Sequence, residues 1–399
     1  MQRGPSDPCP VCANLFGNLV LDHRECIPTL QNVTLKTREE ALHFPTGKLK
    51  IFWCAQCSFV WNEDFDPDKI SYNDGYNNDV TYSGYYVAHL ENMADRIVNS
   101  VPQNQSIHYV EIGCGEADFL RLVVERAKGR CVSATGFDPS FSSTEKLPDG
   151  AVVHRSFFGA DQLPLVPEAT NVICSRHTIE HVQDVQSFVR ALAAPVTTYS
   201  RTLFVETPDA NWILRHTAFQ DFFYEHCSIY TPDAIELILN THGLSAKTAP
   251  VYGTQYMWTE ARLATNEKPA KRNISPELAH CYIEKSAELL RGWERFVQKN
   301  AQQGPVAIWG AASKGVTFAL LLSQLQNATA KIACAIDLNE AKQGCYLPVS
   351  GVPVVSPKKA QDMGVQCVII MNPNYHDEIV RMADEMGWTP KIATLNERN

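Results

Sequence analysis

The sequence has little of what marks membrane and secreted proteins. No apolar run approaches the roughly 18 residues that a membrane-spanning helix needs. The start of the chain, Met1 to Asp7, is polar and lacks the apolar stretch of a secretory signal. Repeats and low-complexity segments are absent as well. We therefore expect a soluble, cytoplasmic protein with no membrane partner.

Positive charge is also scarce. Against 35 lysines and arginines the chain has 44 acidic residues, which gives a net charge of -9. A protein that grips a nucleic-acid backbone normally carries a basic surface, so we expect no nucleic-acid partner. The composition is 45% hydrophobic and 20% charged, which is ordinary for globular proteins and excludes wholesale disorder. A length of 399 residues indicates two or three domains, in a monomer or a homodimer.

The thirteen cysteines are too sparse for the disulfide framework of a small secreted domain. Four of them form two Cys-x-x-Cys pairs, Cys9 with Cys12 and Cys54 with Cys57. Two such pairs bring four thiolates to one tetrahedral zinc ion, although a redox pair or two unrelated pairs would have the same spacing. Four protein ligands leave no open position, so we predict a structural Zn²⁺ rather than one that activates water.

Strand-like and helix-like segments alternate in the middle of the chain, which is typical of an α/β fold with a largely parallel sheet. The predicted strands lie at 107–112, 131–138, 171–175 and 202–206, and a helix is predicted at 119–127. Ser275-Pro276 predicts the capped start of a helix that runs to about Gln303, after which the alternation resumes. The expected organisation is a zinc-binding domain (1–72), a connecting segment (73–105), an α/β core (106–262) and a connecting helix with a smaller α/β domain (263–399).

A glycine-containing loop, Glu111-Ile112-Gly113-Cys114-Gly115, joins the first of these strands to the helix. Its glycines allow a tight turn and close approach by a ligand. Asp138-Pro139 ends the next strand about twenty residues on, where a carboxylate can accept both ribose hydroxyls. The third glycine of a dinucleotide site and the Gly-Lys-Ser/Thr of a triphosphate loop are both missing. S-adenosylmethionine therefore fits better than NAD, with Glu111 orienting the loop and the methionine ammonium.

These motifs resemble those of the three-part S-adenosylmethionine-dependent sugar C-methyltransferases. That family has a zinc-binding N-terminal domain, a class I methyltransferase core and a Rossmann-like C-terminal domain. The resemblance covers nearly the whole chain and continues at 175–181, 222–227, 310–315 and 342–348. It implies a nucleotide-linked keto-deoxysugar as the small-molecule substrate. It also implies that Ser175 and His177 belong to the cofactor site.

Methylation of a carbon beside a ketone needs a base, and histidine is the default candidate because its pKa is near neutral. By resemblance His226 is this base, Glu225 polarises it or contacts the sugar, and His181 faces the substrate. The family segment Tyr-His-Glu-His corresponds to 223–226, so the chain has Phe223 in place of the tyrosine and Tyr224 in place of a histidine. The alternatives are a surface loop for the Glu-His pair and a helix-cap or packing role for His181.

Two further regions are implied by the resemblance. In the family a tyrosine of the connecting segment acts as a lid that closes over the cofactor, and both Tyr76 and Tyr82 are candidates here, with packing at a domain boundary as the alternative. In the C-terminal domain, the amides of the helix that follows Gly310 to Gly315, together with Lys314, are able to hold a substrate phosphate. The alternative for this segment is a purely structural domain that forms a wall of the cleft. The segment 374–378 also matches a family turn that faces the cleft, with a helix cap as its alternative.

Three functions compete at this point. The first is C-methylation of a nucleotide-linked ketosugar through an enolate generated by His226. The second is a methyltransferase with an oxygen or nitrogen acceptor or a non-sugar substrate, which the altered segment 223–226 favours. The third is a zinc-bearing binding module, which the acidic charge and the intact cofactor loop disfavour. Replacement of His226 by alanine separates the first two, and failure to bind S-adenosylmethionine would favour the third.

Overall fold

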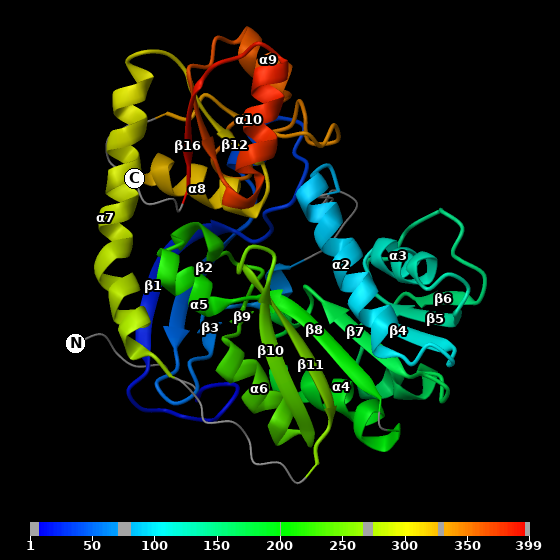
Figure 1. Cartoon of the computed structure of the whole chain (residues 1–399). Helices are drawn as coiled ribbons and strands as arrows, with labels where there is room; N and C mark the ends of the chain where they lie inside the picture. Colours follow the sequence, from blue (N-terminus) through cyan, green and yellow to red (C-terminus); the bar gives the residue numbers. More distant parts are fainter. Residues whose placement is uncertain (1–7, 71–80, 200, 266–273, 326–330, 396–399) are drawn as a thin grey trace.

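The computed structural model describes residues 8–70, 81–199, 201–265, 274–325 and 331–395, and within them the strands form three sheets. Figure 1 shows the N-terminal sheet beside the large central sheet, with the C-terminal sheet above both. Helices pack against the largely parallel central sheet and the parallel C-terminal sheet, which confirms the predicted α/β fold class. None of the helices in the described ranges is both long and apolar enough to cross a membrane.

The N-terminal sheet is antiparallel and was not expected from the sequence. It contains β1 (Leu19–Pro28), β2 (Thr46–Trp53) and β3 (Val60–Asn62), with the short helix α1 (Arg38–Leu42) between the first two. A fourth strand, β9 (Ser228–Ile229), comes from the middle of the chain and pairs antiparallel with β3. Thr37 and Glu40 form a capping box that starts α1.

The central sheet has the strand order β10-β11-β8-β7-β4-β5-β6. Its strands are β4 (Ile107–Ile112), β5 (Cys131–Phe137), β6 (Ala151–His154), β7 (Val172–Arg176), β8 (Thr202–Pro208), β10 (Leu244–Val251) and β11 (Tyr256–Leu263). Five strands are parallel, and the hairpin β10–β11 adds an antiparallel edge. The four predicted strands are confirmed as β4, β5, β7 and β8. The chain runs outward from β4 in both directions, so ligands are expected at the carboxyl ends of β4 and β7.

The helices of this part follow the strands in the expected alternation. They are α2 (Gly84–Ser100), α3 (Asp118–Arg126), α4 (Val185–Tyr199), α5 (Ala210–His216) and α6 (Pro232–Thr241), together with the short 3-10 helices η3 (Ile179–His181) and η4 (Phe219–Asp221). Helix α3 confirms the helix predicted at 119–127. Because all five residues of β7 are buried, this strand lies between covered faces, as is typical of a parallel sheet.

The long helix α7 (Pro276–Ala301) leads to the C-terminal sheet, which is parallel with the order β14-β13-β12-β15-β16. Its elements are β12 (Val306–Trp309), α8 (Ser313–Gln324), β13 (Cys334–Ile336), β14 (Val354–Val355), α9 (Pro357–Asp362), β15 (Cys367–Ile370), η5 (Pro373–Tyr375), α10 (His376–Glu385) and β16 (Lys391–Thr394). The predicted helix at 276–303 is thus confirmed, but Ser275 as its capping side chain is wrong. With ψ of 86° the residue is not extended, and its hydroxyl makes no capping hydrogen bond.

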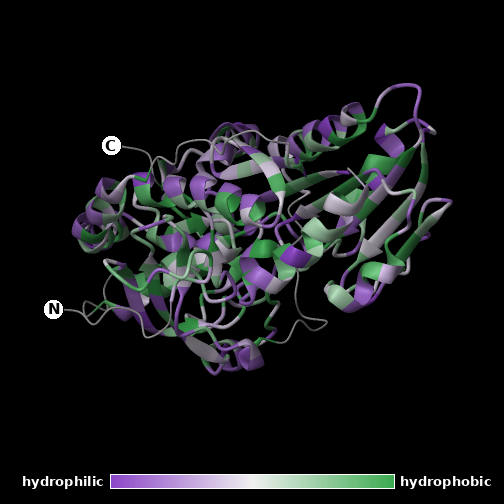
Figure 2. Ribbon diagram, turned by 90° about the horizontal axis from the view of Figure 1, so that it is seen from below, coloured by the Kyte–Doolittle hydropathy of each residue, from purple (hydrophilic) through white to green (hydrophobic). Residues whose placement is uncertain are grey.

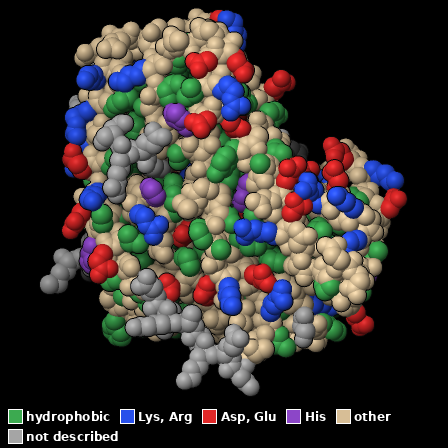
Figure 3. Space-filling view, viewed as in Figure 1, with side chains coloured by type: hydrophobic (Ala, Val, Ile, Leu, Met, Phe, Trp, Pro, Cys, Tyr) green, Lys and Arg blue, Asp and Glu red, His purple; other side chains and the backbone are tan. Residues whose placement is uncertain are grey.

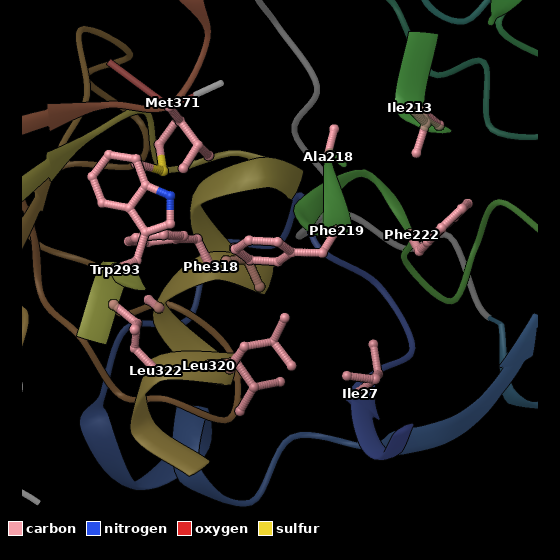
Figure 4. Packing of buried hydrophobic residues seen from close by; sticks show 14 of the residues in the cluster. Ile27, Ile213, Ala218, Phe219, Phe222, Trp293, Phe318, Leu320, Leu322 and Met371 are labelled. Carbon is pink, nitrogen blue, oxygen red and sulfur yellow. The ribbon is translucent and has the colours of Figure 1, made fainter. Parts of the chain in front are cut away.

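One continuous hydrophobic cluster joins the N-terminal sheet and the C-terminal sheet to α5 and η4 of the central part. Figure 4 shows Phe318 of α8 between Trp293 of α7 and Phe219 of η4, with Ile27 of β1 nearby. The ring centres of Trp293 and Phe318 are 5.8 Å apart, and those of Phe219 and Phe318 are 6.3 Å apart. Figure 2 shows hydrophobic ribbon segments inside the molecule and hydrophilic ones around them. Because the packed cluster spans all three parts, it fixes the walls of any cavity between them.

Candidate active site

The glycine loop lies at the carboxyl end of β4, immediately before α3. Gly113 (φ +75°) and Gly115 (φ +52°) both adopt left-handed conformations that favour glycine. A Cβ on Gly113 would lie 1.9 Å from Thr178 Oγ1, whereas a Cβ on Gly115 would meet nothing within 4 Å. The first glycine therefore allows two loops to pack together. The second faces open space that a ligand is able to occupy.

Asp138 follows β5 and is fixed by its own loop. Its Oδ2 accepts from the Gly115 amide at 2.8 Å, and its Oδ1 accepts from the Ser140 amide at 2.8 Å and from the Ser140 hydroxyl at 2.6 Å. This holds a carboxylate beside the open face of Gly115, with Pro139 next in the chain. Cys114 points inward, because a Cβ on Gly136 would lie 2.7 Å from its Sγ. The cysteine side chain thus packs beneath the loop.

Buried charges lie beneath this loop. Glu111 is 2% exposed and accepts a hydrogen bond from the Tyr109 hydroxyl at 3.2 Å. Burial raises the pKa of Glu111 to about 8, although the positive charge of Arg176 opposes the rise. Arg176 forms an ion pair with the buried Glu206, Nε to Oε2 at 2.6 Å. Ser175 is also buried, and its hydroxyl has no hydrogen-bond partner.

A cavity of about 200 Å³ lies between the central sheet, the C-terminal sheet and the N-terminal part. Four of the predicted site residues line it: His177, His181, Glu225 and His226. The cofactor-loop residues and Ser175 do not. Many lining residues were not predicted, among them Asn32, Tyr86, Trp212, Asp221, Gln255, Tyr256, Trp309, Met371 and Asn372. They come from segments far apart in the sequence, and no local motif signals them.

The two candidate lid tyrosines have different outcomes. Tyr76 lies outside the described residues. Tyr82 is 48% exposed and does not line the cavity. Tyr86, one turn further along at the start of α2, does line it. The only sequence signal that pointed to it is its place in the tyrosine-rich stretch 82–86, because Tyr82 itself precedes the helix.

His226 has a pKa well below its usual range. Burial is the main cause, and the nearby His181, His177 and Lys314 add to it because they disfavour a second positive charge. Its ring meets that of His181 edge-on at 4.7 Å and that of Phe223 at 4.1 Å. A histidine kept neutral at pH 7 in a cavity has a nitrogen able to accept a proton.

Glu225, expected to act on His226 or the sugar, lies beside His181. The buried Glu225 carboxylate accepts from the Gln31 amide at 3.2 Å and lies 3.9 Å from His181 Nδ1. A second buried carboxylate, Glu180, was not predicted as a site residue. One nitrogen each of His181 and His226 and a Glu180 oxygen all lie within 4.8 Å of one another. The Glu180 carboxylate also accepts from His177 Nδ1 at 3.2 Å and from the Thr207 hydroxyl at 3.0 Å.

The two departures from the family segment have different structural roles. Phe223 lines the cavity, whereas Tyr224 does not. The Tyr224 hydroxyl accepts from the Asp66 amide at 2.8 Å, and its ring fills the space beside Gly47, where a Cβ would lie 2.1 Å from it. Tyr224 therefore belongs to the contact with the N-terminal sheet.

The loop that carries Glu225 and His226 is held by the N-terminal part along its length. Buried Arg24 of β1 donates to the carbonyl oxygens of Phe219 at 2.7 Å and Phe222 at 3.1 Å. The Asn62 amide donates to the Cys227 carbonyl at 3.0 Å, and the pairing of β3 with β9 follows directly. The N-terminal sheet thus determines where these two side chains lie.

The C-terminal sheet supplies the opposite wall. Lys314 of α8 forms an ion pair with Asp221 of η4, and its Nζ lies 5.0 Å above the Trp212 ring. Asp337 accepts from the Ala311 amide at 2.8 Å, so this acid is used within its own loop. The segment 374–378 spans the end of η5 and the first turn of α10, where Glu378 accepts from the Ser83 hydroxyl and the Tyr85 backbone amide at the start of α2. This turn therefore holds a helix that borders the cavity.

Cys9, Cys12, Cys54 and Cys57 converge as the spacing predicted. Their sulfur atoms all lie within 4.8 Å of one another, with Cys9 and Cys57 at 3.6 Å and Cys12 and Cys54 at 3.5 Å. Zn–S bonds of about 2.3 Å in a tetrahedron set the sulfurs about 3.8 Å apart, so the cluster is compatible with zinc. Gln186 of α4 donates to the carbonyls of Pro10 and Val11, which docks the cluster on the central part.

The chain matches two family models, one for a methyltransferase domain at residues 86–248 and one for a C-methyltransferase C-terminal domain at residues 269–392. A relative is the C-methyltransferase NovU of Streptomyces niveus, 24% identical over 327 residues, which covers 75% of this chain and 74% of that protein.

Solved structures give weaker likenesses. An O-methyltransferase family protein from Burkholderia thailandensis has a TM-score of 0.33 at 11% identity, over 46% of this chain and 59% of that one. A SAM-dependent methyltransferase from Aquifex aeolicus has a TM-score of 0.33 at 13% identity, over 43% and 89%. The two family models and the relative bear out the predicted activity: the chain is an S-adenosylmethionine-dependent methyltransferase of the C-methylating kind.

Proposed function

We propose that this enzyme transfers a methyl group to a carbon beside the ketone of a nucleotide-linked keto-deoxysugar, through an enolate that His226 generates. The observation that carries the proposal is the grouping of His226, His181 and Glu225 in one cavity, with the two histidine rings 4.7 Å apart and Glu225 3.9 Å from His181 Nδ1. Oxygen and nitrogen acceptors need less base strength than a carbon acid does. Burial keeps His226 unprotonated and able to accept a proton, but the lowered pKa also makes it a weaker base, so stabilisation of the enolate oxygen by a neighbouring group has to make the carbon acid more acidic.

The proposed roles follow from the contacts. His226 takes the proton from the substrate carbon, and the electrons of that C–H bond pass into the ketone to give the enolate. His181, held on its Nδ1 side by Glu225, is our candidate for the group that faces the enolate oxygen. Trp212, Phe223 and Met371 exclude water around the charge.

The cofactor residues fit S-adenosylmethionine. The open face of Gly115 leaves room for the ligand, Asp138 lies beside it as the ribose acceptor, and Glu111 lies below as the partner of the methionine ammonium. When bound, the cofactor supplies an electrophilic methyl group. The proposed site continues from this loop toward His177 and Tyr86, which border the cavity.

We further propose that the four-cysteine cluster holds a structural Zn²⁺. All four ligand positions are filled by thiolates, so the ion would not bind water or substrate. Its role would be to fix the N-terminal sheet, which in turn holds the loop with Glu225 and His226.

The test is turnover of a panel of nucleotide-linked 4-ketosugars with methyl-labelled S-adenosylmethionine in deuterated water, followed by mass spectrometry and carbon-13 NMR. We expect a new carbon-bound methyl group and deuterium exchange at the neighbouring carbon. His226→Ala should abolish the exchange but keep cofactor binding, while His23→Ala, on the exposed side of β1, should keep both. Cofactor binding without exchange or turnover would refute the ketosugar assignment. Turnover that survives in His226→Ala would indicate a heteroatom acceptor.

A further inference from the structure

Glu180 is a buried carboxylate that has no role in the proposed mechanism. It is the middle residue of η3 and is 0% exposed. Figure 3 shows acidic side chains interspersed with basic ones on the viewed face of the molecule, where water and salt screen their charges. A carboxylate that is taken out of water is costly unless nearby groups compensate it, so the neighbours of Glu180 indicate what it does.

Two residues fix the Glu180 side chain from the central sheet. The hydroxyl of Thr207, a fully buried residue of β8, donates to its Oε2 at 3.0 Å. The Nδ1 atom of His177 lies 3.2 Å from its Oε1. Because a carboxylate has about four lone-pair sites, these two contacts leave capacity for a further positive group.

The helix η3 is also fastened to the chain that directly follows His226. Cys227 Sγ donates to the Glu180 carbonyl oxygen at 3.7 Å, and the Ser228 hydroxyl donates to the Val182 carbonyl oxygen at 2.8 Å. These contacts hold the buried carboxylate and the proposed base next to each other, although the two residues are far apart in the sequence.

The other carboxylate of the cavity is directed elsewhere. Glu225 precedes His226 in the chain, yet it accepts from the Gln31 amide at 3.2 Å and lies 3.9 Å from His181 Nδ1. Glu180 instead has an oxygen within 4.8 Å of one nitrogen of His226 as well as one of His181. At this separation two charges in a buried site attract each other far more strongly than in water, and such contacts often shorten when substrate binds.

Removal of a proton by His226 creates a positive charge that needs an anion. Accepting the substrate proton turns the ring into an imidazolium. Burial, two neighbouring histidines and Lys314 all disfavour this cation, so the pKa of His226 lies well below its usual range. A fixed negative charge beside the ring lowers the cost of the cation as it forms.

We infer that Glu180 is a positioning residue for proton removal: its carboxylate stabilises the imidazolium of His226 and orients the ring, without touching the substrate. The inference rests on the proposed function, in which His226 is the base. In this step the substrate C–H bond breaks, an N–H bond forms on His226, and the electron pair of the C–H bond passes into the ketone. Glu180 exchanges no proton, as is true of the aspartate in a Ser-His-Asp triad.

The test measures proton removal separately from methyl transfer. With S-adenosylhomocysteine in place of the methyl donor, the wild type should introduce deuterium from deuterated water into the nucleotide-linked ketosugar that it accepts. Glu180→Gln keeps the shape of the side chain and an acceptor for Thr207 but loses the charge. We expect its exchange rate at saturating substrate to fall by about tenfold or more while KM stays unchanged. Glu180→Asp keeps the charge and should exchange faster than Glu180→Gln.

A matched control is Glu294→Gln. Glu294 is a buried glutamate of α7 that accepts from the Gln298 side chain at 3.5 Å and does not line the cavity. This variant should exchange deuterium like the wild type. Thermal unfolding of all three variants checks that they fold.

Undiminished exchange in Glu180→Gln, or a change confined to KM, would overturn the inference. Equal losses in Glu180→Gln and Glu180→Asp would do the same, because the charge would then have no effect. If neither variant folds, nitrogen-15 NMR of the wild-type histidines decides, since a fixed carboxylate beside the ring holds His226 in one tautomer and a mixture of two would exclude this role. Absence of exchange in the wild type with S-adenosylhomocysteine bound would refute the proposed function itself.

Discussion

Two glycines with the same backbone conformation allow the cofactor loop to be tested by a single added methyl group. Gly115 (φ +52°) and Gly129 (φ +82°) are both left-handed, and at each a Cβ would meet nothing within 4 Å. Gly129 lies in the turn after α3, at the other end of that helix from the cofactor loop. The variants Gly115→Ala and Gly129→Ala therefore differ in location but not in local strain.

The expected stability change is the same for both. Placing an alanine in the left-handed region costs about 1–2 kcal/mol, and neither methyl group clashes with the protein. Urea unfolding should therefore give similar losses in the free energy of unfolding. Gly113→Ala should lose more, because its Cβ would also lie 1.9 Å from Thr178 Oγ1.

The effect on the ligand should separate the two variants. In Gly115→Ala the methyl group enters the space assigned to the cofactor, so calorimetry should show S-adenosylhomocysteine binding weakened by well over tenfold. Gly129→Ala should bind it like the wild type. If Gly115→Ala retained the affinity of Gly129→Ala, the cofactor could not lie against the open face of this loop, and the reasoning would fail.

Three other predictions follow from buried charges and thiols. Because the free Glu111 has a pKa raised to about 8 and must ionise to face an ammonium, cofactor affinity should rise with pH toward about 8 and fall again where the ammonium itself loses its proton. Titrations from pH 6 to 9 test this, and a pH-independent wild type would contradict it. Removal of zinc by a chelator, or the variant Cys54→Ser, should lower the melting temperature by several degrees. Elemental analysis should then find less than one zinc per chain. An unchanged melting temperature would argue against a structural ion. Arg24→Met should slow turnover at least tenfold while the affinity for S-adenosylhomocysteine stays constant. The reason is that Arg24 holds the loop before His226 with two hydrogen bonds of about 1–3 kcal/mol each. Loss of affinity would point to general misfolding instead.

The sequence predicted those parts of the molecule that depend on local pattern. The strands β4, β5, β7 and β8 are short apolar runs at regular intervals, and the two Cys-x-x-Cys pairs have a spacing that brings them to one point. The N-terminal sheet was missed because β9, its fourth strand, lies more than 160 residues from β3 in the chain. Only packing of distant segments brings these strands together.

The candidate site divides in the same way. His181, Glu225 and His226 were predicted and line the cavity, but their pairing was not predictable. Glu225 lies beside His181 because η3 packs against the loop before β9. This packing is not visible in the order of residues along the chain. Tyr224 points away from the cavity because Gly47 and Asp66 of the N-terminal part leave room for its ring and bind its hydroxyl.

The short strand β9 makes the N-terminal sheet inseparable from the centre of the chain. A chimera that exchanged residues 8–70 alone for those of a relative would pair a foreign β3 with the native β9 and remove Arg24 from the carbonyls it binds. Exchange of residues 8–70 together with 219–229 would transfer both partners of the β3–β9 pairing and of the Arg24 hydrogen bonds. Transplanting substrate preference between enzymes of this architecture would therefore require two separate stretches of sequence, moved as a single unit.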